Sequence, residues 1–194
     1  MIYKRSSLLS IILLLCASGG AGGATVLTAQ AAPDAEEYSV YSALLEKEFA
    51  RGGPPLVILA DYPSWDAYAR GGAQYLRTLM PSVPEEVRDD FEAKNRRPYR
   101  LRDQLRAGVP YVLVSLEECR ELLRRQKRKE YKARCPSLSW SMTLSRVGFS
   151  AGRDRAVVYV GIRCRGLCGS GEYFLLTKES GAWEIRERRR VWVS

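Results

Sequence analysis

Residues 155–164 read Arg-Ala-Val-Val-Tyr-Val-Gly-Ile-Arg-Cys, and this stretch decides the fold. One of its faces carries the alternate apolar side chains Ala156, Val158, Val160 and Ile162. Val157 and Tyr159 make the opposite face apolar as well. Because side chains alternate between the two faces of a strand, this pattern predicts a central strand that is covered on both sides.

The same period of two continues through the C-terminal part of the chain. We expect four strands, at about 139–149, 155–164, 172–178 and 183–193. The connections between them are short and rich in Gly and Ser. Short connections join antiparallel neighbours, so the four strands are predicted to form an antiparallel meander.

The first half of the chain is predicted to contain helices and two further strands. Three helices are expected to begin at capping residues, each with a Glu three positions later, and these are Asp34, Ser82 and Ser115. A further helix is expected over 65–79, and at most two helical turns are expected at 101–105. The apolar runs 56–60 and 109–114 indicate buried strands, which either extend the C-terminal sheet or pair separately. This order predicts an α+β fold, in which N-terminal helices and two buried strands pack on a C-terminal meander of about four strands, with the helices on one sheet face.

The first 31 residues have the three parts of a secretory signal peptide. Lys4 and Arg5 form a positive start, and residues 8–15 form an apolar core. Residues 29–31 read Ala-Gln-Ala, a sequence that signal peptidase accepts. We therefore expect residues 1–31 to be removed on export.

Cleavage at this site leaves a single α+β domain over 32–194, which we expect to be secreted or periplasmic in a bacterium. One alternative is an uncleaved signal that anchors the chain, and only this segment would then contact the membrane. The Gly- and Thr-containing stretch 20–28 makes a poor anchor. A second alternative is a lipoprotein modified at Cys16, but lipidation needs a small residue before the Cys and Leu15 precedes it.

Four cysteines remain after cleavage, namely Cys119, Cys135, Cys164 and Cys168. An even number in an exported domain predicts disulfides. Cys164 and Cys168 flank a short turn, so we expect them to bond to each other. In one unbroken helix, Cys119 and Cys135 would lie about 24 Å apart, and their bond requires a break between them that no Gly or Pro marks.

The loop that begins at Cys164 is the most distinctive segment of the chain. It is rich in glycine, and its candidate ligand-binding residues are Arg165, Gly166, Gly169, Gly171 and Tyr173, with Arg165 and Tyr173 at the rim. A phosphate-binding loop would continue into a helix through Gly-Lys-Ser/Thr, whereas a strand is predicted here. The alternatives are a hairpin that its own disulfide closes, or a redox-active CxxxC pair.

The chain is basic, with 31 Lys and Arg against 22 Asp and Glu and a formal net charge of +9. This charge attracts anionic partners such as nucleic acid, acidic polysaccharide or lipid headgroups. The densest basic stretch predicts a weak polyanion-binding patch at Arg124, Arg125, Lys127 and Arg128. Few aromatic residues lie nearby, so we expect no specific nucleic-acid binding, and the alternative is a solvated helix face. The basic run 186–190 indicates a sheet edge that charge protects from aggregation.

Catalytic and metal-binding patterns are scarce in this sequence. It contains no histidine, which excludes Ser-His-Asp and Cys-His catalysis in their usual forms. The cysteine spacings contain no CxxC pair, so we expect no metal site and no cofactor. The paired carboxylates lie near predicted helix starts, where they complement the helix dipole.

Three C-terminal motifs carry a resemblance to a known group of proteins. These are Leu167-Cys168-Gly169-Ser170-Gly171, Gly181-Ala182-Trp183-Glu184-Ile185 and the ending Trp192-Val193-Ser194. Together they resemble a family of exported bacterial proteins of unknown function. The resemblance implies export and a single domain, and it implies no activity, ligand or site residue.

These observations favour an exported, non-catalytic binding or interaction module with an unidentified ligand or envelope partner. The alternative function is a cell-envelope hydrolase or a thiol-active enzyme. A cleft with converging carboxylates or a thiol of lowered pKa would favour the enzyme, whereas a large apolar concavity without titratable groups would favour ligand binding.

Overall fold

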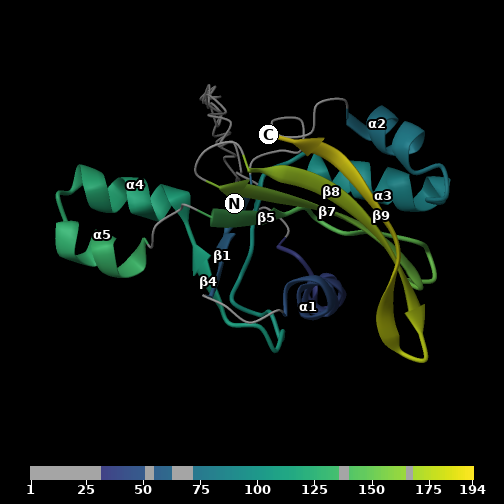
Figure 1. Cartoon of the computed structure of the whole chain (residues 1–194), viewed down its shortest axis with the longest axis horizontal. Helices are drawn as coiled ribbons and strands as arrows, with labels where there is room; N and C mark the ends of the chain where they lie inside the picture. Colours follow the sequence, from purple (N-terminus) through teal and green to yellow (C-terminus); the bar gives the residue numbers. More distant parts are fainter. Residues whose placement is uncertain (1–31, 51–54, 63–71, 136–139, 165–167) are drawn as a thin grey trace, which may run out of the picture.

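A mixed seven-stranded sheet forms the centre of the computed structural model, which describes residues 32–50, 55–62, 72–135, 140–164 and 168–194 (Figure 1). The strand order is β4-β1-β5-β7-β8-β9, and β6 also pairs with β7. The strands are β1 (Leu56–Leu59), β4 (Tyr111–Val114), β5 (Trp140–Leu144), β6 (Gly148–Phe149), β7 (Arg155–Cys164), β8 (Ser170–Glu179) and β9 (Ala182–Val193). Residues 1–31, for which a signal peptide is predicted, lie outside the described residues.

The C-terminal strands form the expected antiparallel meander. β5, β7, β8 and β9 pair in that order, and each pair is antiparallel. β7 is central, and its two apolar faces belong to different cores: Val158 packs in one core cluster, while Val157 and Tyr159 pack in another. The α+β fold predicted from the sequence is therefore confirmed.

The two N-terminal strands extend this sheet rather than pairing separately. β1 runs parallel to β4, with Leu56 opposite Tyr111, and also parallel to β5. β4 is an edge strand, and its Val112 side chain is exposed, so the predicted full burial of 109–114 is wrong. A separate two-stranded ribbon pairs β2 (Asp61–Tyr62) with β3 (Tyr99–Arg100).

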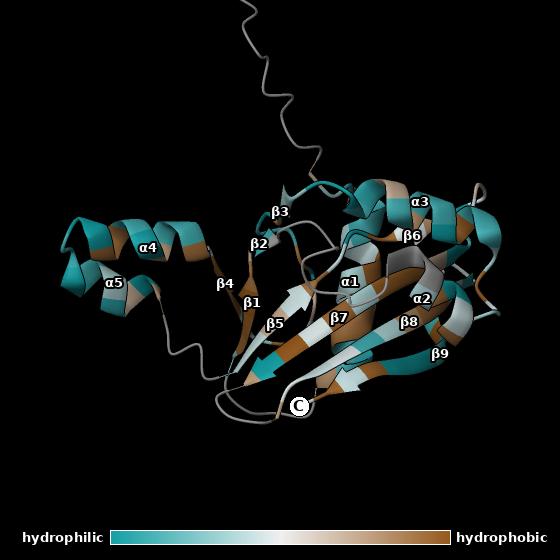
Figure 2. Cartoon of the chain, turned by 90° about the horizontal axis from the view of Figure 1, so that it is seen from above, coloured by the Kyte–Doolittle hydropathy of each residue, from teal (hydrophilic) through white to brown (hydrophobic). Residues whose placement is uncertain are grey.

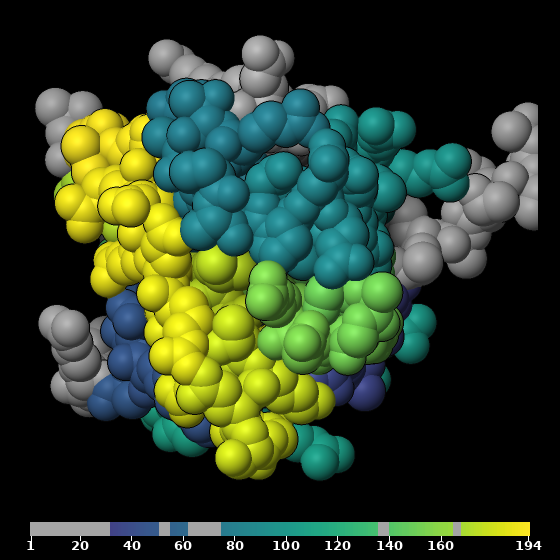
Figure 3. All heavy atoms as spheres, turned by 90° about the vertical axis from the view of Figure 1, so that its right-hand side faces the viewer, coloured from purple at the N-terminus to yellow at the C-terminus, as the bar shows by residue number. Residues whose placement is uncertain are grey.

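Helices cover both faces of the sheet, not the single face that the sequence pattern indicated. α1 (Ala35–Phe49) lies against one face, where Tyr41, Leu44 and Leu45 are buried. α2 (Gly72–Leu79) and α3 (Glu85–Asn95) cover the other face. Figure 1 shows α1 on the side opposite α2 and α3, and Figure 3 shows the 75–95 region packed against the C-terminal strands. Two further helices, α4 (Leu116–Arg124) and α5 (Arg128–Arg134), follow β4.

Local capping explains where some of these helices begin. Asp34 and Glu37 form the predicted capping box of α1, since each side chain accepts a hydrogen bond from the other residue's backbone N–H. Ser82 does not cap α3, because the helix begins after Pro84 and the Ser82 hydroxyl donates to Glu187 instead. The segment 101–105 is not helical.

A buried ion pair joins the first helix to the sheet. Glu37 is fully buried, and it accepts hydrogen bonds from Nη2 (2.6 Å) and Nε (2.8 Å) of Arg146. The backbone N–H of Val147 donates to the same carboxylate at 3.0 Å. Asn95 of α3 accepts from the N–H of Arg146 and donates to its carbonyl. α1, α3 and the segment before β6 are therefore held together by one hydrogen-bonded network.

Candidate functional site

A helical hairpin projects from the sheet edge and is the most distinctive surface feature of the described chain. We call residues 115–135, which contain α4 and α5, the α4–α5 hairpin. It follows the edge strand β4 and extends away from the sheet (Figure 1), and most of its residues are hydrophilic (Figure 2). α4 and α5 pack mainly on each other.

The first turn of the hairpin is fixed to the end of strand β1. Ser115 is the N-cap of α4, and its hydroxyl oxygen accepts from the N–H of Glu118 at 3.1 Å. The same hydroxyl donates to Asp61 Oδ2 at 2.6 Å. The Glu118 side chain pairs with Arg134 instead of returning to the cap. Asp61, which begins β2 two positions after β1 ends, therefore anchors α4 and supplies negative charge to its N-terminus.

The sequence leaves open whether the helix that begins after Ser115 continues unbroken to Cys135, and the structure shows two helices, α4 and α5. The chain reverses at Gln126, whose φ of 56° lies in the left-handed region. The N–H of Lys127 donates to the carbonyl of Leu122 (2.9 Å), and the N–H of Gln126 donates to that of Leu123 (3.0 Å). This pair of bonds is a Schellman C-cap, in which Gln126 occupies the position that Gly usually takes.

The break at Gln126 allows the disulfide that the sequence left open. Cys119 and Cys135 are bonded, with their Cα atoms 6.0 Å apart. The bond lies in a small core with Val114 and Leu122, against which Val57 and Tyr131 also pack. The hairpin is therefore closed covalently at its base, and its small core is separate from the cores on the two sheet faces.

The charges of the hairpin are only partly neutralised. Glu121 pairs with both Arg124 and Arg125, and the hydrogen bond from Arg125 holds the pKa of Glu121 below its ordinary value. Lys127 lies 3.6 Å from Glu130. Four other hairpin cations form no salt bridge with any residue of the described segments, and these are Arg120, Arg128, Lys129 and Lys132. Of the four residues of the predicted patch, Arg128 is therefore the one without a salt bridge to the described residues.

The arginines of the last strand differ from those of the hairpin. Glu172, which is buried on β8, pairs with both Arg188 and Arg190 of β9. Arg186 pairs with Glu179, and Arg189 pairs with Glu187. Arg188 also reaches Glu48 of α1 at 2.9 Å. Carboxylates of neighbouring elements thus neutralise the basic run of β9, in agreement with a charged sheet edge.

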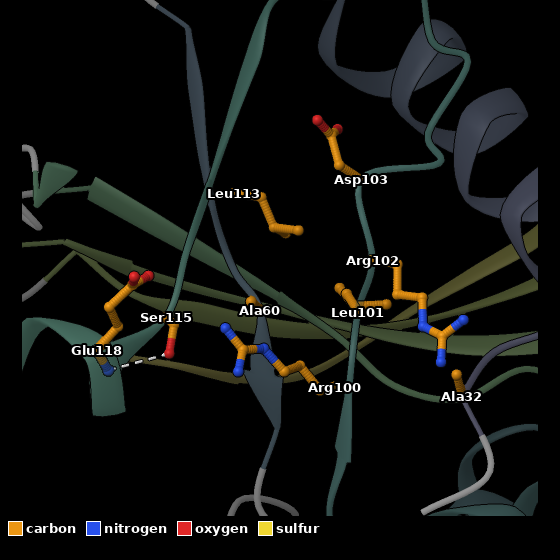
Figure 4. A pocket seen from close by; sticks show the side chains of 9 residues that line it. All are labelled: Ala32, Ala60, Arg100, Leu101, Arg102, Asp103, Leu113, Ser115 and Glu118. Carbon is orange, nitrogen blue, oxygen red and sulfur yellow. Dashed lines mark hydrogen bonds between the residues drawn. The ribbon is translucent and has the colours of Figure 1, made fainter.

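A cleft lies at the base of the hairpin, where the parallel strands β1 and β4 end. It has a volume of about 620 Å³, and Arg100, Ser115 and Glu118 are among its lining residues. A second hollow of about 400 Å³ shares these three residues and continues along the hairpin to Arg124, Arg125 and Lys127. Figure 4 shows the guanidinium of Arg100 on the side of Ser115, while Arg102 points toward Ala32. The carboxyl ends of parallel strands are a common location for ligand sites.

A third hollow, of about 970 Å³, lies along the outer side of α1. It is lined by α1, by residues 103–106 and by the turn between β8 and β9, and it includes Tyr38, Glu46 and Trp183. Several of these residues already hold the 101–108 segment, because Tyr38 and Glu46 accept hydrogen bonds from the N–H groups of Arg102 and Gly108. This hollow therefore follows from the way the loop is attached to the helix.

The glycine-rich loop is closed by the expected disulfide. Cys164 and Cys168 are bonded, with Cα atoms 5.7 Å apart. Tyr173 is fully buried between Phe91 and Tyr159, and not at the rim of a ligand site. Arg165 and Gly166 lie outside the described residues.

The two described glycines of this loop approach other parts of the protein. A Cβ atom at Gly171 would collide with Trp192 and with the Tyr159 hydroxyl, and Gly169 is similarly close to Trp192. The Trp192 Nε1–H donates to the Tyr159 hydroxyl at 2.8 Å. The close backbone approach that these glycines allow is therefore made to the C-terminal strand.

Metal-binding clusters and membrane-spanning helices are both absent from the described residues. No group of three or more His, Cys, Asp or Glu side chains in these segments could hold a metal ion. No helix within the same segments has the length and apolar character needed to cross a bilayer. The chain matches no family model, no curated protein sequence and no solved structure.

Proposed function

We propose that this chain is an exported, non-catalytic binding module that holds an anionic partner through the α4–α5 hairpin. The observation that carries the proposal is a projecting, disulfide-closed element whose cations Arg128, Lys129 and Lys132 have no carboxylate partner among the described residues. Arg100 also lines the hollow at its base, but Nε of this arginine already lies 3.5 Å from Oδ1 of Asp61.

Two of these cations, Arg128 and Lys129, are placed unfavourably for the dipole of α5. Arg128 and Lys129 occupy the first two positions of this helix, where the helix dipole disfavours positive charge. Glu at these positions would be more favourable for folding by about 0.3–1 kcal/mol each. The stability of α5 therefore does not explain why these two positions are basic.

Export supports the same proposal. Two disulfides in one domain are characteristic of oxidising compartments, and the N-terminal 31 residues have the pattern of a signal peptide. We therefore place the protein outside the cytoplasm, in the periplasm or the external medium of a bacterium.

The proposal is tested by charge reversal with short duplex DNA as a generic polyanion. The variant Arg128→Glu/Lys129→Glu/Lys132→Glu should bind DNA much more weakly than the original protein. The slope of the logarithm of the binding constant against the logarithm of the salt concentration should also become less steep by up to about 2.7, because each phosphate contact contributes about 0.9. Thermal unfolding should show that the hairpin variant is folded and no less stable than the original protein, because Glu at the first two positions of α5 complements the helix dipole.

The matched control reverses three exposed arginines elsewhere, in Arg97→Glu/Arg106→Glu/Arg155→Glu. It changes the net charge by the same amount, so it should reduce binding only slightly. Equal losses in the two variants would show that net charge alone attracts the polyanion, and the proposed role of the hairpin would then be wrong.

A further inference from the structure

An exposed leucine lies among the basic residues of the hairpin. Leu123 is 52% exposed, and in the described part of the chain only Val112 and Val193 are other large apolar side chains with more than about a third of their surface exposed. Its neighbour Leu122 is buried beside the Cys119–Cys135 disulfide. Successive side chains of a helix point about 100° apart, so Leu123 points away from this core.

Unneutralised cations accompany this leucine. Arg120 precedes Leu123 by three positions and therefore shares its side of α4. The chain turns at Gln126, directly after the helix, and Arg128 and Lys129 then begin α5 at the same end of the hairpin. The end of the hairpin thus presents one apolar side chain together with a concentration of positive charge.

This combination favours one class of anionic partner over the others. A polysaccharide or the backbone of a nucleic acid attracts cations but gains little from an exposed leucine. A bilayer that contains anionic lipids attracts clusters of Lys and Arg to its headgroups and accepts apolar side chains at the interface. The hairpin also projects beyond the sheet edge, so its end can reach a flat surface (Figure 2).

We infer that the end of the α4–α5 hairpin binds the surface of a bilayer rich in anionic lipid, with Leu123 entering the interface and the nearby cations contacting headgroups. The inference rests on the proposed function and names the class of its partner. Contact is peripheral and reversible, because one leucine and a few cations anchor a protein far more weakly than a spanning helix does.

The test uses the exported, processed protein and sedimentation with two kinds of vesicle. One kind is phosphatidylcholine with about one-third phosphatidylglycerol, and the other is phosphatidylcholine alone. We expect binding to the first kind only. Leu123→Ser should weaken this binding about fivefold, because about half of the leucine surface is exposed and would be buried in the interface. Reversal of one cation, Arg128→Glu, should weaken it at least about fivefold.

Two comparisons separate the inference from the proposed function. Leu123→Ser should leave binding to duplex DNA unchanged, because that binding needs charge alone. Val193→Ser removes a side chain of similar type that is 66% exposed on β9, outside the hairpin, and it should leave vesicle binding unchanged.

Each contrary result has a definite meaning. Binding to DNA without binding to anionic vesicles would overturn the lipid inference and leave the proposed function standing. Failure to bind either probe would overturn both. An equal loss of DNA and vesicle binding in Leu123→Ser would show that the leucine supports the hairpin fold, and the interfacial contact would then be rejected.

Discussion

Removal of the Cys119–Cys135 disulfide should loosen the α4–α5 hairpin without unfolding the sheet. The bond closes a loop with a sequence separation of 16 residues. The chain-entropy relation for such a loop gives about 3 kcal/mol of stabilisation at 25 °C. The small core around the bond contains only a few side chains, and α4 and α5 pack mainly on each other, so the loss should remain local.

Native-state hydrogen exchange of Cys119→Ser/Cys135→Ser measures this loss segment by segment. A loss of about 3 kcal/mol should accelerate exchange of the hairpin amides about 150-fold where they open locally. Amides of β7 and β8 should exchange at their original rates, because they lie in the main sheet. Binding to anionic probes should fall as well, since the cations would no longer be held on one projecting surface.

The second disulfide supplies the control. Cys164→Ser/Cys168→Ser opens a loop with a separation of only 4 residues, for which the same relation gives about 2 kcal/mol. This variant should leave the hairpin amides unaffected. Unchanged exchange in the hairpin after loss of the Cys119–Cys135 bond, or equal acceleration in β7 and β8, would refute the view that the hairpin is a separately stabilised element.

The buried Glu37, the hydroxyl of Tyr41 and the turn at Gln126 give further tests. Glu37→Gln leaves the charge of Arg146 buried without its carboxylate, so urea denaturation should show a loss of about 3–5 kcal/mol. Burial raises the pKa of Tyr41 well above its ordinary value. The stability that this shift provides is fully present below the pKa of tyrosine in the unfolded chain, near 10, and it is lost as pH rises through the pKa of Tyr41 in the folded protein. In Tyr41→Phe, Tm should therefore fall less steeply at alkaline pH than it does in the original protein. Gln126→Gly removes the backbone strain of a non-glycine residue in the left-handed region, so hydrogen exchange of the hairpin amides should slow by up to about fivefold. Faster exchange in this variant would contradict the account of the turn. N-terminal sequencing of the exported protein should begin at Ala32, and an intact N-terminus would contradict the expected cleavage.

The C-terminal strands could be predicted because their signal is local. In 155–164 both faces are apolar and the turns on either side are short, so strand and pairing partner follow from the same stretch. The positions of β1 and β4 could not be predicted in this way. Their parallel pairing, with Leu56 opposite Tyr111, joins segments 55 positions apart, and no nearby turn fixes their register.

The sequence predicts the basic residues of the candidate site but not the helical hairpin that presents them. Charge density located the basic stretch, but local preferences favour one helix across it, because no Gly or Pro interrupts 116–134. The useful signal was the pair of cysteines at its ends, which can bond only if the helix turns back. The glycines near Cys168 indicate a close approach of the backbone to another group, which the sequence pattern favours as a ligand. The group they approach is Trp192, which is more than 20 positions away, and a sequence pattern does not show such a contact.

The two arginine-rich regions of this protein show why net charge alone does not locate a binding surface. On β9, the buried Glu172 fixes Arg188 and Arg190, so substitution of these arginines would leave a buried carboxylate without its partners and would reduce stability. On the hairpin, Arg128 and Lys129 have no such partner and oppose the dipole of their own helix, so their loss would not reduce stability. Cations that folding does not need are the ones that remain available for a partner. This difference in the available carboxylates supports the proposal that the hairpin, and not the last strand, holds the anionic partner.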